Sequence, residues 1–201
     1  MRKEYTESDR TTKVVGLIPA RYHSSRFEGK PLAMISGIPM IQRVYNQSMQ
    51  SKSLASVIVL TDNSDIYDFC LSMRMKCLIV NGDCFTGTDR CAKAIKDIEG
   101  DVFVNIQGDE PLINPEAIDK LVESHTLGSV SNAYVELDFF SEKRHDNNVV
   151  KVVTDTYDNA LGKIETASGE AAIQKMIMEG GPVETAFTVY SDFEDCTRPP
   201  R

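Results

Sequence analysis

The sequence predicts an α/β fold, in which a mostly parallel sheet carries helices on both faces. Short apolar, β-branched segments alternate with amphipathic segments about every 20 residues as far as residue 125, and this alternation is typical of βαβ units. Each apolar segment is followed by a polar or glycine-containing loop, as expected at the carboxyl ends of parallel strands. The 201 residues, of which 41% are hydrophobic, suffice for one such domain.

The first five elements follow from local hydrophobic patterns. Residues 14–18 form a β-branched apolar run that should be a buried strand ending at Pro19. Residues 39–49 have helical spacing, and residues 55–60 read as a second strand. Residues 64–73 place apolar side chains at i, i+3, i+4 and i+7, which predicts a helix facing the core. Residues 76–80 complete this part as a third strand.

The same alternation continues and then weakens. A helix is expected over residues 89–98, a fourth strand over 101–106, and a helix over 115–124 with a proline at its first turn. Residues 130–137 and 149–154 read as further strands, with a charged connection between them. The regular pattern therefore covers the first 125 residues best.

Composition excludes several classes of protein. The net charge is −8, from 22 basic and 30 acidic residues, which argues against nucleic acid as a partner, because its binding relies on basic surface. No apolar run approaches the roughly 18 residues of a membrane span. Residues 1–13 form a polar extension without the apolar core of a signal peptide. The sequence has five cysteines, an odd number, and no two of them form a Cys-x-x-Cys pair. Reduced thiols and a cytoplasmic location are therefore expected.

A cationic loop follows the first predicted strand. Arg21, Arg26 and Lys30 lie within ten residues of one another, together with Gly29. Arginine makes forked contacts to phosphate oxygens, lysine supplies a mobile charge, and a following helical turn adds its dipole. The alternative is an ordinary solvated basic loop. The position directly after a buried strand favours a phosphate site.

An acidic motif, Gln107-Gly-Asp-Glu-Pro111, follows the fourth predicted strand. Mg²⁺ prefers oxygen ligands and is commonly bound by one or two carboxylates together with substrate phosphates. In isolation, such a motif is more often a helix cap or an acidic turn. Because it should meet the cationic loop at one edge of the sheet, a site for a metal and a nucleotide is the better interpretation, with Asp109 as metal ligand.

The loop before the 89–98 helix contains Thr86, Gly87 and Thr88. Small and hydroxyl-bearing residues would let a base or ribose approach the backbone closely. The alternative is a helix cap in which Thr88 caps the segment from Asp89 onward. Taken alone, the loop favours the cap.

In this order the segments resemble the 3-deoxy-D-manno-octulosonate cytidylyltransferases, also called CMP-KDO synthetases, over about residues 14–161. The motifs that carry the resemblance are Ile18-Pro-Ala-Arg-Tyr with Ser25-Arg26 and Gly29-Lys-Pro-Leu, Thr61-Asp62, Thr86-Gly-Thr-Asp-Arg90, Asn105-Ile-Gln-Gly-Asp-Glu-Pro111 and Asn148-Val-Val-Lys-Val-Val153. The resemblance implies a nucleotidyltransferase-type, Rossmann-like fold.

The resemblance also implies an activity and a set of site residues. The activity would be Mg²⁺-dependent transfer of CMP from CTP to an eight-carbon keto-sugar acid, with release of pyrophosphate. The implied residues are Arg21, Arg26 and Lys30 as catalytic groups, Asp109 as metal ligand, and Pro19, Ala20, Arg21, Thr86, Gly87, Thr88 and Gln107 at the nucleotide. A homodimer is implied as well.

The sequence departs from the family pattern in three places. Phe27-Glu28 stands where the family usually has Leu-Pro, and Cys84-Phe85 replaces a polar pair. After Leu161, the expected sugar-acid-binding strand, dimerisation segment and second Mg²⁺-binding aspartate are not recognisable. We therefore expect an incomplete domain over 14–161, truncated at its C-terminal part. The alternative function is a catalytically inactive nucleotide-binding remnant in a truncated or chimeric product.

Residues 162–201 read as a foreign tail that should pack poorly, with a helix over 170–179 and a strand over 183–190. Residues 163–193 resemble a stretch of cathepsin B-like cysteine proteases. No position matches that family's catalytic cysteine or histidine, so a protease function is not expected.

Overall fold

The computed structural model describes residues 12–23, 27–125, 130–136 and 183–190. The chain divides into two compact units, residues 1–131 with 188–201, and residues 132–187. Strands β7 (Val130–Glu136) and β8 (Val183–Tyr190) confirm the strands predicted at 130–137 and 183–190. The strand predicted at 149–154 and the helix predicted at 170–179 fall outside the described residues. The domain boundaries predicted at residues 13 and 161 stay predictions.

The described sheet of the first unit is parallel, as the sequence predicts. Its strands are β1 (Val14–Ala20), β4 (Ser56–Thr61), β5 (Cys77–Ile79) and β6 (Val102–Ile106), in the spatial order β5-β4-β1-β6. All three pairings between them are parallel. Their carboxyl ends therefore lie at one edge, where the polar loops follow.

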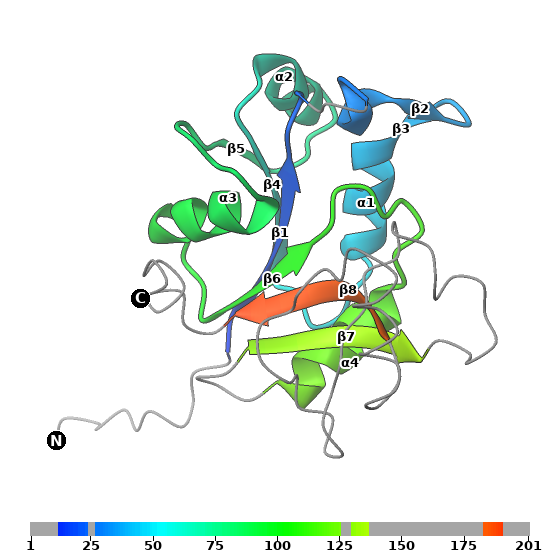
Figure 1. Ribbon diagram of the computed structural model, residues 1–201, viewed down its shortest axis with the longest axis vertical. Helices are drawn as coiled ribbons and strands as arrows, with labels where there is room; N and C mark the ends of the chain where they lie inside the picture. Colours follow the sequence, from blue (N-terminus) through cyan, green and yellow to red (C-terminus); the bar gives the residue numbers. More distant parts are fainter. Residues whose placement is uncertain (1–11, 24–26, 126–129, 137–182, 191–201) are drawn as a thin grey trace, which may run out of the picture. The chain divides into compact units, whose positions relative to one another are not determined.

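Helices cover both faces of this sheet. Helix α1 (Met40–Ser48) and helix α3 (Gly87–Ala94) lie on opposite sides of β1 in Figure 1. Helices α2 (Ser64–Ser72) and α4 (Pro115–Ser124) match their predicted ranges closely. The predicted 89–98 helix ends earlier, because its last residues form a 3₁₀ turn at Ile95–Asp97. None of the helices in the described part of the chain has the length and apolar character needed to cross a bilayer.

Alternating side chains of β1 fill the core on both faces. Val15 and Leu17 pack with Leu60 and with Cys91 of α3. On the other face, a Cβ at Gly16 would lie 2.9 Å from the Leu54 side chain, so that position tolerates only glycine without rearrangement. Burial raises the pKa of the Cys91 thiol to about 12. This cysteine is a core residue, and the described residues contain no cluster of metal-binding side chains.

Strand β1 runs two residues beyond its predicted end, through Pro19. Pairing with β6 ends at Leu17, whereas pairing with β4 continues to Ala20. Pro19 therefore lies where β1 has a strand partner on one side only, and a proline is tolerated at such an edge. The consequence is that the chain stays extended into the loop that carries the cations.

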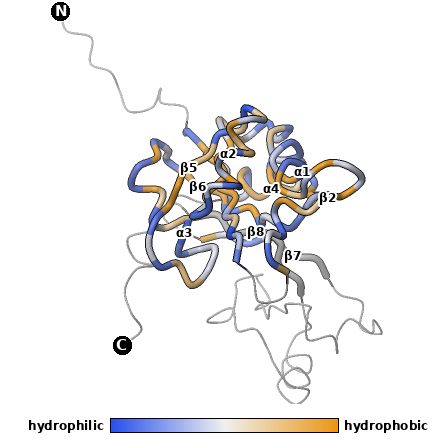
Figure 2. The backbone as a smooth tube through the Cα atoms, turned by 90° about the horizontal axis from the view of Figure 1, so that it is seen from above, coloured by the Kyte–Doolittle hydropathy of each residue, from blue (hydrophilic) through white to orange (hydrophobic). Residues whose placement is uncertain are grey.

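A small hairpin and a 3₁₀ turn follow β1 and were not predicted. The turn is η2 (Lys30–Leu32), and the hairpin consists of β2 (Met34–Ile35) and β3 (Ile38–Pro39). Its two loop residues, Ser36 and Gly37, have φ values of 48° and 76°, which is the left-handed geometry of a two-residue hairpin turn. The chain at β2 is coloured as hydrophobic in Figure 2.

The environment of His125 predicts a loss of stability in acid. Nδ1 lies 3.0 Å from Ser131 Oγ, and Nε2 is buried without a hydrogen-bond partner among the described residues. Burial lowers the pKa of His125, so the unfolded chain binds the proton more tightly than the folded chain. The contribution of neutral His125 to the free energy of unfolding is present above the unfolded pKa of about 6.5. It is lost as the pH falls from there through the lower pKa of the folded chain.

Thermal midpoints measured between about pH 8 and pH 5 should therefore fall less in His125→Gln than in the parent. His23→Gln is the matched control, because His23 is exposed. A parent-like pH profile in His125→Gln would contradict the prediction.

Candidate functional site

A cavity of about 390 Å³ opens at the carboxyl ends of β1 and β6, within the size range of small-molecule sites. It is lined by three loops that the sequence analysis singled out, those after β1, β5 and β6. The lining residues are Pro19, Ala20, Arg21, Lys30, Pro31, Met40, Cys84, Phe85, Thr86, Gly87, Arg90, Gln107, Gly108 and Asp109. The fold thus brings together segments that are up to 90 residues apart.

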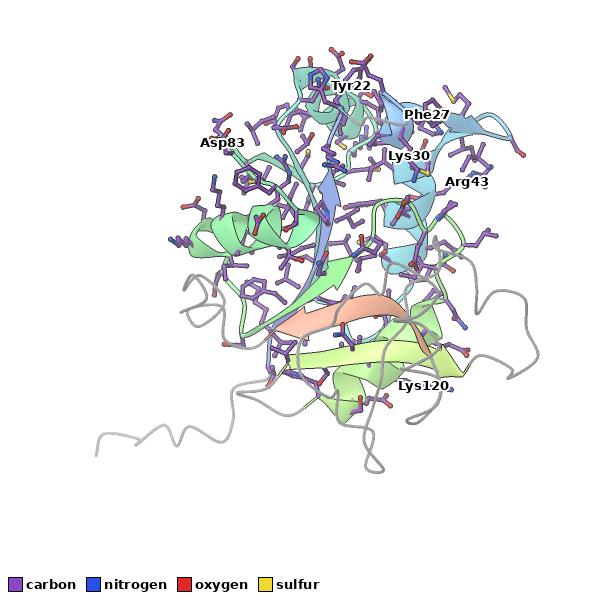
Figure 3. All side chains as sticks on the ribbon, in the orientation of Figure 1. Tyr22, Phe27, Lys30, Arg43, Asp83 and Lys120 are labelled. Atoms are coloured by element: carbon purple, nitrogen blue, oxygen red, sulfur yellow. The ribbon has the colours of Figure 1, made fainter. Side chains whose placement is uncertain are left out.

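The loop after β1 positions Lys30 through a glycine. The Gly29 N–H donates to the Tyr22 carbonyl at 2.9 Å, which closes the loop, and Gly29 has a φ of 67° that other residues rarely adopt. Lys30 follows in the turn η2, near the carboxyl end of β1 (Figure 3). Its Nζ donates to Asp109 Oδ2 at 2.6 Å. A cation and a carboxylate 79 residues apart therefore meet in the cavity.

Asp109 reaches the cavity because Gly108 precedes it. A Cβ at Gly108 would lie 2.7 Å from the Pro19 carbonyl oxygen. The neighbouring atom belongs to the backbone, so a larger residue could be accommodated only by moving β1 or the 107–109 segment. The absence of a side chain at this position sets the spacing between the two loops.

Gly108→Ala should consequently weaken ligand binding at this site and lower stability by roughly 1–3 kcal/mol, the usual cost of overpacking. Thermal unfolding and ligand titration measure both effects. Gly37→Ala is the control, because a Cβ there meets no atom within 4 Å, although its φ of 76° carries a strain of its own. Parent-like ligand binding in Gly108→Ala would show that the close approach to Pro19 has no role in the site.

The loop before α3 is held by a capping box. Thr86 Oγ1 accepts from the Asp89 N–H at 3.1 Å, and Asp89 Oδ2 accepts from the Thr86 N–H at 2.8 Å. The cap expected at Thr88 is thus formed by Thr86, so the helix begins two residues earlier. Thr88 instead accepts from Asn105 Nδ2 at 3.4 Å and does not line the cavity.

A buried arginine, Arg90, forms part of the wall and was not among the predicted site residues. Arg90 is only 3% exposed. Its guanidinium donates to the Val80 carbonyl at 3.1 Å and to Asp62 Oδ2 at 2.6 Å. Arg90 is the last residue of the Thr86–Arg90 motif, and that motif was the only sequence signal that could have pointed to a role for it in the site. Its burial and its pairing with Asp62 depend on the fold.

The donor chemistry of Asp109 fits Mg²⁺ that is shared with a phosphorylated ligand. The described residues contain no group of three or more acidic, histidine or cysteine side chains that could enclose a metal. Mg²⁺ does not need such a cage, because it keeps several waters and binds through one or two carboxylates plus substrate phosphates. Asp109 could supply one carboxylate beside the cationic loop.

Most of the predicted site residues meet in the cavity. These are Pro19, Ala20, Arg21, Lys30, Thr86, Gly87, Gln107 and Asp109. Thr88 lies outside the lining, and Arg26 lies outside the described residues. The residues that the sequence analysis did not assign, Pro31, Met40, Cys84, Phe85, Gly108 and Arg90, are mainly apolar or buried.

Comparison with known proteins finds similar chains among the 3-deoxy-manno-octulosonate cytidylyltransferases. The chain is 48% identical over 115 residues to the mitochondrial 3-deoxy-manno-octulosonate cytidylyltransferase of Arabidopsis thaliana, which covers 56% of this chain and 40% of the relative. It is 41% identical over 155 residues to the Zea mays enzyme of that name, covering 75% of this chain and 51% of the relative. The chain thus spans about half the length of these relatives.

The structural comparison extends over more of the chain. A solved structure of CMP:2-keto-3-deoxy-manno-octonic acid synthetase complexed with CTP matches with a TM-score of 0.80 and 28% identity, covering 94% of this chain and 79% of that one. The predicted fold class and the resemblance of the N-terminal region are confirmed. The cathepsin B-like resemblance of residues 163–193 stays a prediction.

A family model described as cytidylyltransferase matches residues 15–173, which is most of the chain. The cavity, with its cationic loop and Asp109, lies within that match. The chain therefore belongs to the cytidylyltransferase family.

Proposed function

We propose that this chain transfers CMP from CTP to 3-deoxy-D-manno-octulosonate. The observation that carries the proposal is the cavity in which Lys30 and Asp109 meet at the carboxyl ends of β1 and β6. A triphosphate requires cations, and a metal bridging its oxygens requires a carboxylate. Family membership and the relatives' names support the choice of CTP and of the keto-sugar acid.

The reaction requires little covalent work from the protein. The anomeric hydroxyl of the sugar acid forms a bond to the α-phosphorus of CTP, the bond between the α-phosphorus and the bridging oxygen breaks, and pyrophosphate leaves. The hydroxyl proton passes to solvent. Phosphoryl transfer of this kind depends on positioning and on neutralising charge. In the proposal Arg21, Arg26 and Lys30 hold the triphosphate, and Gln107 lies at the nucleotide.

Asp109 is proposed to hold Mg²⁺, which when bound would neutralise phosphate charge and polarise a phosphoryl oxygen. Its Oδ2 accepts a hydrogen bond from Lys30 Nζ. Both side chains are about half exposed, so the pair is weak enough to separate when a ligand arrives. Lys30 is then free to turn toward phosphate oxygens.

The homodimer that the resemblance implies, and the cytoplasmic location expected from the cysteines, both belong to the proposal. Within the described residues Cys70, Cys77, Cys84 and Cys91 are free thiols, which suits a reducing compartment. Light scattering of the purified chain tests the dimer.

Pyrophosphate release in the presence of CTP, Mg²⁺ and 3-deoxy-D-manno-octulosonate tests the activity directly. A full-length relative serves as the positive control, and reactions lacking the sugar acid serve as the blank. Release above the blank supports the transferase. Stabilisation by CTP–Mg²⁺ without release would identify a nucleotide-binding protein that lacks the transfer activity.

Lys30→Met should weaken CTP binding about 10- to 150-fold, because one hydrogen bond to a charged group contributes roughly 1.5–3 kcal/mol. Lys120→Met removes the same charge from the exposed surface of α4, away from the cavity, and should leave binding unchanged. Calorimetric titration of both variants measures the difference. Equal binding by the two variants would remove Lys30 from the site.

A further inference from the structure

An exposed aromatic side chain lies in the wall of the cavity. Phe85 is 87% exposed, the highest value among the large apolar side chains of the described residues, yet it is one of the cavity-lining residues. A single exposed apolar residue is ordinary on a protein surface. An aromatic ring that lines a small-molecule cavity without being packed is different, because its face remains available to a ligand.

The residues that line the cavity are partly charged and partly neutral. Of the charged ones, Lys30 and Asp109 are in contact, and Arg21 and Arg90 also line the cavity. Gly87, two residues from Phe85, packs so close to Pro19 that a Cβ there would lie 3.0 Å from the proline ring. Gly108 approaches the carbonyl side of the same proline. Pro19 therefore lies between the loop that carries Phe85 and the segment that carries Asp109.

These two kinds of lining residue suit the two chemical halves of a nucleoside triphosphate. The phosphates require the cations and the carboxylate, so they belong with Lys30 and Asp109. The base carries no charge and has two apolar faces, so it belongs with the neutral residues Pro19, Cys84 and Phe85. The capping box of Thr86 and Asp89 stabilises the backbone next to Phe85.

We infer that the Phe85 ring stacks on the pyrimidine base of the nucleotide. The inference deepens the proposed function and rests on it. Stacking of a base on an aromatic side chain contributes about 1–3 kcal/mol and is tolerant of base identity. Phe85 should therefore increase affinity for nucleoside triphosphates without distinguishing CTP from UTP. Discrimination between those two is left to polar groups.

Two ligands separate a base contact from a phosphate contact. Dissociation constants are measured with CTP–Mg²⁺ and with inorganic tripolyphosphate–Mg²⁺, which lacks the base. Phe85→Leu should weaken CTP binding about 5- to 150-fold, the equivalent of 1–3 kcal/mol, and leave tripolyphosphate binding unchanged. Phe85→Tyr keeps the ring and should bind CTP like the parent. The ratio of CTP to UTP affinity should be the same in all three proteins.

A control and a spectroscopic signature complete the test. Leu112→Ala removes another apolar side chain, 83% exposed and outside the cavity lining, and should not change CTP binding. The cytosine H5 and H6 resonances should shift upfield on binding to the parent and to Phe85→Tyr, because a stacked ring shields them. That shift should be lost with Phe85→Leu.

Parent-like CTP binding by Phe85→Leu overturns the stacking inference and leaves the proposed function intact. Equal losses for CTP and tripolyphosphate also overturn it, because they show a disturbed loop. A raised KM for the sugar acid with unchanged CTP affinity overturns it as well, by placing Phe85 at the other substrate. If the parent binds no CTP, the proposed function itself fails.

Discussion

Asp109→Asn is expected to remove most of the Mg²⁺-dependent CTP binding while leaving the fold intact. The substitution keeps the shape of the side chain and removes the anionic oxygen that a magnesium ion requires. A metal contact to phosphate contributes several kcal/mol, so we expect affinity to fall about 100-fold or more. The free energy of unfolding without ligand should change by no more than about 1 kcal/mol, since the lost Lys30–Asp109 pair is half exposed.

Thermal unfolding with and without CTP–Mg²⁺ separates the possible roles of Asp109. At a ligand concentration 100 times the dissociation constant, the parent should gain about 2.7 kcal/mol. A variant with 100-fold weaker binding should gain only about 0.4 kcal/mol at the same concentration. Repeating the titration without Mg²⁺ should bring parent and variant close together, because the lost contact depends on the metal.

Glu99 provides a matched control, because it is an acidic residue that forms an exposed ion pair with Lys13 outside the cavity. Glu99→Gln should gain as much from CTP–Mg²⁺ as the parent does. If Asp109→Asn also gains the full amount, Asp109 is not the metal ligand.

Asp62→Ala should lower the free energy of unfolding by about 2 kcal/mol. The Arg90 side chain is 4% exposed, whereas Asp62 is 42% exposed. Removing one partner of a buried pair costs about 3–5 kcal/mol because the other charge remains buried, and the partial exposure of Asp62 reduces that cost. Arg90 also lines the cavity, so CTP binding should weaken as its guanidinium loses its orientation.

A double-mutant cycle with Arg90→Met tests the cause. If the cost arises from an unpaired guanidinium, Asp62→Ala should cost much less in the Arg90→Met background than in the parent. Chemical denaturation of the four proteins gives the coupling energy. Additive costs would mean that the two side chains act independently, and the 2.6 Å contact would then have no energetic importance.

The strands were predictable because they are continuous apolar runs. Residues 55–60 and 101–106 contain mainly β-branched and other apolar residues, and the structure has strands at Ser56–Thr61 and Val102–Ile106. The end of β1 was less predictable. A proline ordinarily marks the end of a strand, and Pro19 lies within β1 because pairing with β6 ends at Leu17 while pairing with β4 continues to Ala20.

The hairpin of β2 and β3 was missed although its turn signal, Ser36-Gly37, is local. Its strands are only two residues long, too short for a hydrophobic alternation to be seen. The cap of α3 was placed two residues late, because Thr86 and Thr88 are both suitable capping residues. In the structure Thr86 caps the helix, and Thr88 accepts a hydrogen bond from Asn105 of β6.

The amino-acid sequence alone determined the class of the fold and the chemistry of the cavity. Alternating apolar segments specify parallel strands, and the residues after each strand specify cations, a carboxylate and small hydroxyl-bearing groups. Periodicity and side-chain chemistry are local properties, so they can be read from neighbouring residues. The order of the strands, and therefore which loops become neighbours, is set by packing between distant segments.

Only the tertiary structure decided which of those groups touch. The Lys30–Asp109 contact joins residues 79 apart, and the buried Arg90–Asp62 pair joins residues 28 apart. The exposure of Phe85 at the cavity and the approach of Gly108 to Pro19 likewise depend on how whole loops pack. Burial and distance are properties of the assembled sheet, and no single segment of the sequence contains them.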